Sequence, residues 1–189
     1  MFKLSLPNKK RLYMALYPRE PSVENPESFH VALLLMRKQP TNEVDDTVRY
    51  HVISKINPQR EVVWSFVAEH GVRARTIKLV GLVLLGKIPP DVTQGHLEAC
   101  LRSIPMEQDN PMWNCTHWVM NAIETLAQEQ IIPTPSKPPE MILANADRFI
   151  SGLERDPEAP IPTCSIEGNE ITSELVDSMY AYGPGMRTK

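Results

Sequence analysis

The first half of the chain is built from short apolar segments that alternate with polar or proline-containing turns. The segments span residues 11–17, 29–36, 47–56, 61–69 and 76–88. A continuous apolar run between turn signals, such as Phe29–Met36, is typical of a buried central strand. The two segments on either side of Asn57 and Pro58 are expected to pair as a hairpin. Interior glycines disfavour a helix over residues 76–88, which predicts a further strand, bent or bulged at Gly81.

Helical periodicity begins in the second half. Asp91 or Thr93 can cap a helix that runs to about Ile104, and a second helix is expected from Cys115 to about Gln130. Residues 141–153 can form a third helix that docks on the sheet. Strands followed by helices predict an α+β fold, with an antiparallel sheet of about four to five strands packed against helices.

Length and composition restrict the class of protein. A chain of 189 residues fits one domain, here residues 1–156, followed by a tail at 157–189 rich in Pro, Gly and Ser, which can dock on the domain and can form a short helix at 172–180. With 20 Lys and Arg against 23 Asp and Glu, the net charge is −3, so no nucleic-acid partner is expected. The basic residues of segment 73–78 are interpreted as a solvated strand edge.

The cysteines and the hydropathy pattern predict a cytoplasmic protein. Cys100, Cys115 and Cys164 are an odd number at irregular spacing, which excludes a disulfide framework and a C-x-x-C zinc site. No apolar stretch approaches the roughly 20 residues that span a bilayer, and the N-terminal residues lack the apolar core of a secretory signal. We therefore expect no membrane span, and the sequence does not indicate an oligomeric state.

Cys115 is the first candidate for chemistry. It follows the loop-forming run 105–111 and opens the second predicted helix. Unpaired backbone N–H groups and the positive end of the helix dipole favour an anion at that position and lower the pKa of a thiol. The alternative is that Cys115 is a small buried hydrophobic residue, the commoner role of an isolated cysteine.

Two of the five histidines lie within apolar strand segments. His30 and His51 would lose hydration on burial, so each requires a hydrogen-bond partner. Neighbouring strands could place the two imidazoles side by side, with Cys115 presented to them from a helix packed on the sheet. The alternative is that each is a core histidine bonded to the backbone.

The other histidines give weaker signals. His117 is two residues after Cys115, so on a helix it points about 200° away and is expected to pack or cap locally. His96 and Cys100 are four residues apart but lack further ligands nearby, so no metal site is predicted. His70, beside a glycine in a turn, is expected to be exposed.

The cysteine motif resembles that of a known enzyme family. Asn114-Cys115-Thr116-His117-Trp118-Val119 is similar to the Asn-Cys-Glu-His-Phe-Val motif of the lecithin–retinol acyltransferase-like proteins, the circularly permuted branch of the papain-like NlpC/P60 thiol enzymes. Phe29-His30-Val31-Ala32-Leu33-Leu34 resembles the strand that carries the first histidine of that family, and His51 occupies the position of the second. The chain also resembles a group of uncharacterised fungal proteins.

The resemblance implies a permuted papain-like fold and a reaction mechanism. By it, Cys115 would be the nucleophile, His30 its base and His51 the residue that orients His30. We expect thiol-dependent acyl transfer on an ester, thioester or amide, with helix N-terminal N–H groups stabilising the oxyanion and either water or another acceptor releasing the acyl enzyme.

Further site assignments accompany this prediction. Asn114, Trp113 and Trp64 are the expected substrate-binding residues, the partner is a small-molecule or acyl substrate, and no cofactor is expected. The alternative function is a non-catalytic binding or interaction module on the same scaffold, with Cys115 buried and inert.

Overall fold

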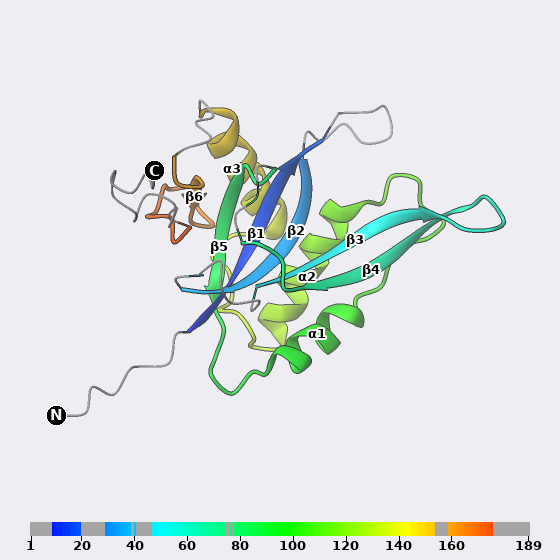
Figure 1. Cartoon of the computed structure of the whole chain (residues 1–189), viewed down its shortest axis with the longest axis horizontal. Helices are drawn as coiled ribbons and strands as arrows, with labels where there is room; N and C mark the ends of the chain where they lie inside the picture. Colours follow the sequence, from blue (N-terminus) through cyan, green and yellow to red (C-terminus); the bar gives the residue numbers. More distant parts are fainter. Residues whose placement is uncertain are drawn as a thin grey trace, which may run out of the picture.

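The computed structural model describes residues 9–19, 29–38, 40, 47–74, 76, 78–153 and 159–175. Within these residues the chain forms six strands and three helices (Figure 1). The strands are β1 (Lys10–Pro18), β2 (Phe29–Arg37), β3 (Val48–Ile56), β4 (Val62–His70), β5 (Gly81–Lys87) and β6 (Thr163–Cys164). The helices are α1 (Gln94–Arg102), α2 (Cys115–Gln128) and α3 (Pro139–Ser151).

The strands form one open mixed sheet in the order β4-β3-β2-β1-β5-β6. All neighbours pair antiparallel except β5 and β6, which are parallel. The α+β class is therefore confirmed, whereas the expectation of a purely antiparallel sheet of four to five strands is wrong. The difference is β6, a two-residue strand within the segment that the sequence suggested as a tail.

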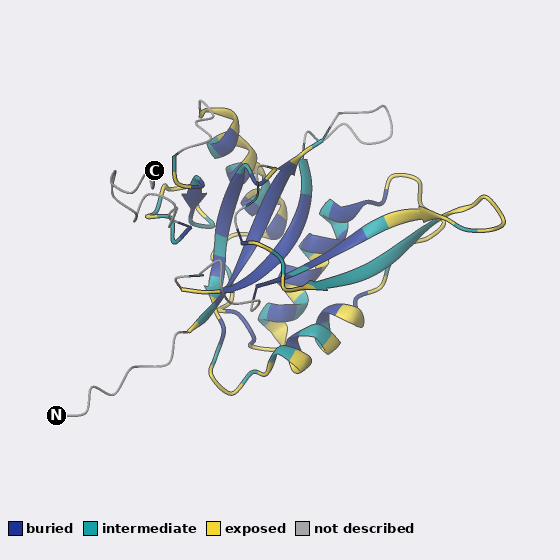
Figure 2. Cartoon of the chain, in the orientation of Figure 1, coloured by how far each residue is buried: buried dark blue, intermediate teal, exposed yellow. Residues whose placement is uncertain are grey.

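Each face of the sheet buries a different set of residues, because successive side chains of a strand point to opposite sides. The face that packs on the helices, called the helical face here, includes Leu12, Met14, Leu16, Val31, Leu33, Leu35, Tyr50 and Val52. The opposite face, called the outer face, includes Tyr13, Ala15, Tyr17, Ala32, Leu34 and Met36, covered by Leu79, Ile161 and Leu175. Figure 2 shows that the centre of the sheet is buried while the far end of the β3–β4 hairpin is exposed.

The C-terminal segment is attached to the outer face by a charged contact. Arg11 Nε on β1 lies 2.7 Å from both carboxylate oxygens of Glu174, and the hydroxyl of Tyr13 donates to the same carboxylate at 3.0 Å. Residues 172–175 are not helical, and the remainder of the predicted helix at 172–180 lies outside the described residues. Residues 159–175 thus share the sheet and core of the preceding chain.

The irregularity in β5 is not at the predicted position. The register between β1 and β5 shifts between the pairs Leu12↔Gly86 and Tyr13↔Leu84, which places the bulge at Leu85 instead of Gly81. Gly81 begins the strand, and a Cβ atom there would lie 1.8 Å from Cδ1 of Ile150 on α3. Glycine is present at this position because a helix packs closely against the backbone.

The pairing between β2 and β3 is much shorter than that of the neighbouring strands. It extends only from Leu33↔Tyr50 to Leu35↔Val48. Beyond Leu33 and Tyr50 the two strands separate, and the β3–β4 hairpin projects away from the rest of the sheet (Figure 1). We call this separation the fork. Helix α2 packs on both β2 and β3, so it crosses the fork from the helical face.

Candidate functional site

The start of α2 is fixed by a capping box. The side chain of Asn114 accepts a hydrogen bond from the backbone N–H of Thr116 at 2.8 Å, and the backbone N–H of Asn114 donates to Nδ1 of His117 at 3.3 Å. Both bonds satisfy donors that a helix N-terminus leaves unpaired. Cys115 is therefore the first residue of the helix, and the expectation that His117 caps locally is confirmed.

His30 and His51 are brought together across the fork. Nε2 of His30 lies 3.1 Å from Nδ1 of His51, and the ring centroids are 5.3 Å apart in an edge-to-face arrangement. His51 is buried and His30 is half-buried. The prediction that neighbouring strands place these imidazoles side by side is confirmed, and each ring has the other as its hydrogen-bond partner.

A carboxylate and a guanidinium extend this pair. Nε2 of His51 lies 3.6 Å from Oε2 of Glu69 on β4, and Arg49 on β3 donates a hydrogen bond from Nε to the same oxygen. The Arg49 guanidinium also lies over the ring of Tyr17, 5.4 Å from its centroid. Sequence reasoning missed Glu69 and Arg49. The register of the β3–β4 hairpin pairs them directly, and it could have been extrapolated from the turn at residues 57–60.

Burial of the two imidazoles and the Arg49 hydrogen bond to Glu69 determine the protonation states of this cluster. It lowers the pKa of His30 to about 4, with further lowering by the positive charges of His51, Arg19 and Arg49. Burial also lowers the pKa of His51, although Glu69 opposes this change. The hydrogen bond from Arg49 holds the pKa of Glu69 below its ordinary value. At neutral pH the site therefore contains two neutral imidazoles beside an ionised carboxylate.

Cys115 and the two histidines lie on different faces of the sheet, whereas the sequence suggested that α2 presents Cys115 directly to the imidazoles. Its side chain is 1% exposed and belongs to the core of the helical face. His51 lies between Tyr50 and Val52, which both point to the helical face, so its ring projects from the outer face. Where the strands are paired, their backbones separate the two layers. Beyond the last paired residues, Leu33 and Tyr50, no backbone ladder joins β2 and β3.

A comparison with protein families identifies the family of this chain. Residues 9–154 match DUF6914, described as a family of unknown function. The chain belongs to the DUF6914 family. No curated protein and no solved structure matches it. In this DUF6914 protein the matched residues include the whole site, from His30 and His51 to Glu69 and Cys115.

The three predicted substrate-binding residues support the start of α2. Asn114 is buried and caps the helix, and Trp113 is 2% exposed and packs edge-on against Trp64, with ring centroids 5.2 Å apart. The amide of Gln108 holds this region by accepting from the Trp64 N–H at 2.7 Å and donating to its carbonyl at 3.1 Å. Their contact with a substrate remains a prediction, and their observed contacts are structural.

Neither a metal-binding cluster nor a membrane-spanning helix occurs in the part of the chain that the structure describes. Among the residues that the structure describes, no group of three or more His, Cys, Asp or Glu side chains could hold a metal ion. Within the same residues, none of the helices has the length and apolarity needed to cross a membrane.

Proposed function

We propose that this DUF6914 protein is a thiol-dependent acyl-transfer enzyme, acting as a hydrolase or acyltransferase on an ester, thioester or amide. Cys115 is the nucleophile, His30 the base and His51 the residue that orients His30. The observation that carries the proposal is the His30–His51 contact, in which His30 uses Nε2 and keeps Nδ1 for another partner. A base oriented by a further polar group is what activation of a cysteine requires.

The order and packing of the elements support a permuted papain-like arrangement. The two histidines come from strands that precede the cysteine helix, and α2 packs on the same two strands, β2 and β3. Cys115 stands at the capped N-terminus of α2, where the helix dipole favours negative charge. The proposal requires Cys115 and His30 to meet at the fork from opposite faces of the sheet.

The proposed reaction has two steps. Sγ of Cys115 attacks the carbonyl carbon while Nδ1 of His30 takes the thiol proton, and the positive end of α2 stabilises the oxyanion. His30 then protonates the leaving group, which departs as the tetrahedral intermediate collapses, re-forming the C=O bond and leaving the acyl group on Sγ. In the second step His30 removes a proton from water, an amine or a hydroxyl. This acceptor attacks the acyl enzyme, and the sulfur leaves and regains its proton.

The low pKa of His30 shapes the first step. At neutral pH the ring is unprotonated, because burial holds its pKa to about 4. The resting site therefore has no imidazolium to stabilise a thiolate in advance, and proton transfer accompanies attack.

The alternative function, a binding or interaction module with an inert thiol, is favoured by the burial of the site. Cys115 and Trp113 retain only 1% and 2% exposure. An acyl-transfer enzyme must admit its substrate to Sγ through the fork, whereas a module needs no such access. Reactivity of Cys115 in the folded protein separates the two functions.

The test is covalent labelling of the full chain by a thiol-reactive acyl probe. We expect labelling of the wild type to be lost in Cys115→Ala and retained in Cys100→Ala, the control for a half-buried cysteine. His30→Asn should slow labelling without unfolding the protein. Undiminished labelling of Cys115→Ala, or labelling of Cys115 only at denaturant concentrations that unfold the chain, would contradict the enzyme and support the module.

A further inference from the structure

The buried Nε2 edge of His51 has an unusual environment. Its Nε2 atom is buried and makes no hydrogen bond. The nearest charged group is the carboxylate of Glu69, whose Oε2 lies 3.6 Å away. A buried polar atom without a hydrogen bond is costly, so its orientation toward a carboxylate requires an explanation.

The contact with Glu69 distinguishes the two neutral tautomers of His51. If Nε2 carried a lone pair, it would face the negative carboxylate oxygen and be repelled. If Nε2 carries the hydrogen, the interaction with the carboxylate is attractive. The second tautomer leaves Nδ1 of His51 as a hydrogen-bond acceptor.

The tautomer of His51 determines the tautomer of His30 through the hydrogen bond between the two rings. Nδ1 of His51 lies 3.1 Å from Nε2 of His30, so an acceptor at Nδ1 requires the hydrogen of His30 to be on Nε2. Nδ1 of His30 then carries the lone pair. The other tautomer of His51 would place a hydrogen on Nδ1 and leave His30 protonated at the nitrogen that has to accept a proton.

Arg49 holds Glu69 in place for this role. It stands directly opposite Glu69 in the β3–β4 ladder and donates from Nε to the carboxylate. Arg49 and His51 are two residues apart on one strand, so their side chains share the outer face. The guanidinium is itself confined by the ring of Tyr17 beneath it.

We propose that Glu69, fixed by Arg49, is a positioning residue that sets the tautomers of His51 and His30 so that Nδ1 of His30 can accept the proton of Cys115. The catalytic meaning of this assignment rests on the proposed function. The tautomers themselves belong to the resting protein and can be measured without any reaction.

The experiment is two-bond ¹H–¹⁵N correlation spectroscopy of the full chain with ¹⁵N-labelled histidine at neutral pH. The five histidines are assigned by single substitution. We expect both His30 and His51 to carry hydrogen on Nε2. In Glu69→Gln the tautomer ratio of His51 should shift toward the Nδ1–H form by on the order of tenfold, because the attraction of Nε2–H to a negative charge is lost. Glu69→Asp should restore part of the preference.

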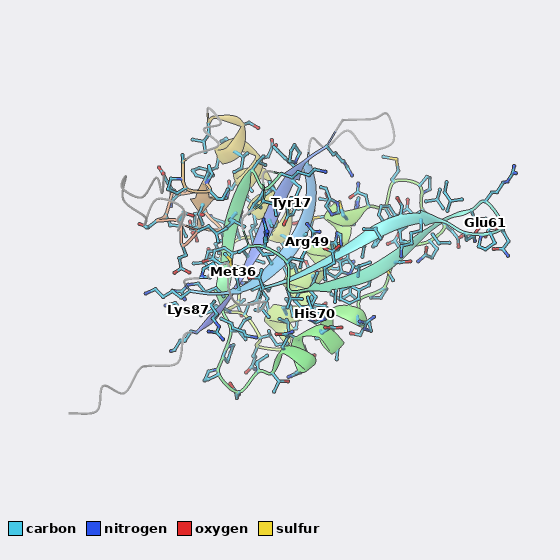
Figure 3. All side chains as sticks on the ribbon, viewed as in Figure 1. Tyr17, Met36, Arg49, Glu61, His70 and Lys87 are labelled. Carbon is cyan, nitrogen blue, oxygen red and sulfur yellow. The ribbon has the colours of Figure 1, made fainter. Side chains whose placement is uncertain are left out.

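Glu61→Gln is the matched control, because Glu61 is exposed at the far end of the same hairpin (Figure 3) and does not contact the imidazoles. It should leave both tautomers unchanged. A wild-type His51 with hydrogen on Nδ1 would overturn the proposal even if Glu69→Gln failed to fold. So would a folded Glu69→Gln variant with unchanged tautomers. If the tautomers are as expected and Cys115 is never labelled, the proposed function fails and the tautomer assignment stands.

Discussion

Nε2 of His30 lies 3.1 Å from Nδ1 of His51, although 21 residues separate the two in the chain. Each ring satisfies one nitrogen of the other in a part of the sheet where the backbone ladder has ended. The contact therefore belongs to the side chains alone and depends on how far β2 and β3 diverge. It gives a buried His51 and a half-buried His30 each a hydrogen-bond partner within otherwise apolar strands.

The first prediction concerns this pair. His30→Ala should slow acylation of Cys115 by roughly 100-fold or more, the usual contribution of a general base. His51→Asn should slow it less, because the Asn carbonyl can still accept from Nε2 of His30. The rates are measured as single-turnover labelling of the full chain with the acyl probe. His70→Ala, at an exposed histidine, is the control and should label at the wild-type rate. Equal rates for all four proteins would show that the imidazole pair takes no part.

The second prediction is that the protein loses stability in mild acid. Burial lowers the pKa of His30 from 6.5 to about 4, so the unfolded chain binds more protons than the folded one between these values. The contribution of His30 to the free energy of unfolding is therefore fully present above pH 6.5 and is lost as the pH falls toward 4. Its full size is on the order of 3 kcal/mol. Glu69, whose pKa is also lowered, adds a loss in the same direction at lower pH.

Urea unfolding at intervals between pH 7.5 and 4 measures this dependence. His30→Asn removes the buried titrating ring, so its stability should vary less with pH over the window than that of the wild type. His70→Ala controls for an exposed ring and should follow the wild-type curve. A wild-type stability that does not change between pH 6.5 and 4 would contradict the assignment of a neutral, buried His30.

Local sequence patterns predicted most of the elements because these depend on neighbouring residues. The five long strands and three helices were expected near their observed positions, and Thr93 caps α1 through a bond from the His96 N–H. The β6 strand has only two residues, too few for any periodicity to be read. Its position follows from tertiary contact with β5, which no local pattern encodes.

The sequence could not show that Cys115 and His30 belong to opposite faces of the sheet, for a related reason. Segment 29–36 is apolar on both faces, so no alternation indicates which residues face the helices. The structure assigns Val31 and Leu33 to the helical face and Ala32 and Leu34 to the outer face. His30 therefore belongs to the outer face, opposite α2. The fork beside the two histidines arises from the divergence of β2 and β3, which is a property of the whole sheet.

The third prediction compares two glycines. Gly81→Ala should destabilise the protein by roughly 1–3 kcal/mol, since its Cβ atom would lie 1.8 Å from Cδ1 of Ile150 and overpack the core. Gly95→Ala is the control, because a Cβ atom at this exposed position in α1 has nothing within 4 Å. There alanine should stabilise the helix by roughly 0.5–1 kcal/mol.

Chemical denaturation of the two variants decides between packing and backbone effects. Shortening Ile150 to Val in the Gly81→Ala background removes the clashing Cδ1 atom and should recover part of the lost stability. If Gly81→Ala were as stable as the wild type, the close approach of α3 to β5 would be wrong.

The fourth prediction concerns the C-terminal segment, which lies beyond the residues matched by the family. Arg11 is 8% exposed, and Glu174 neutralises it at 2.7 Å. Glu174→Ala leaves a buried guanidinium without its counter-charge and should destabilise the protein by about 3 kcal/mol, the lower end of the range for buried pairs because Glu174 is partly exposed. Glu170→Ala should have little effect, because its side chain is exposed and only its backbone bridges Cys164 of β6.

Replacing both members of this ion pair tests the cause of the loss. Apolar substitution of a buried pair removes the desolvation cost together with the attraction, so Arg11→Met combined with Glu174→Leu should be more stable than Glu174→Ala alone. Limited proteolysis of the same variants follows the segment itself. Docking of residues 159–175 covers Tyr13 and Leu82 on the outer face, so cleavage within this segment should be faster in Glu174→Ala than in the wild type or Glu170→Ala. Equal cleavage in all three proteins would show that Glu174 does not hold the segment on the sheet.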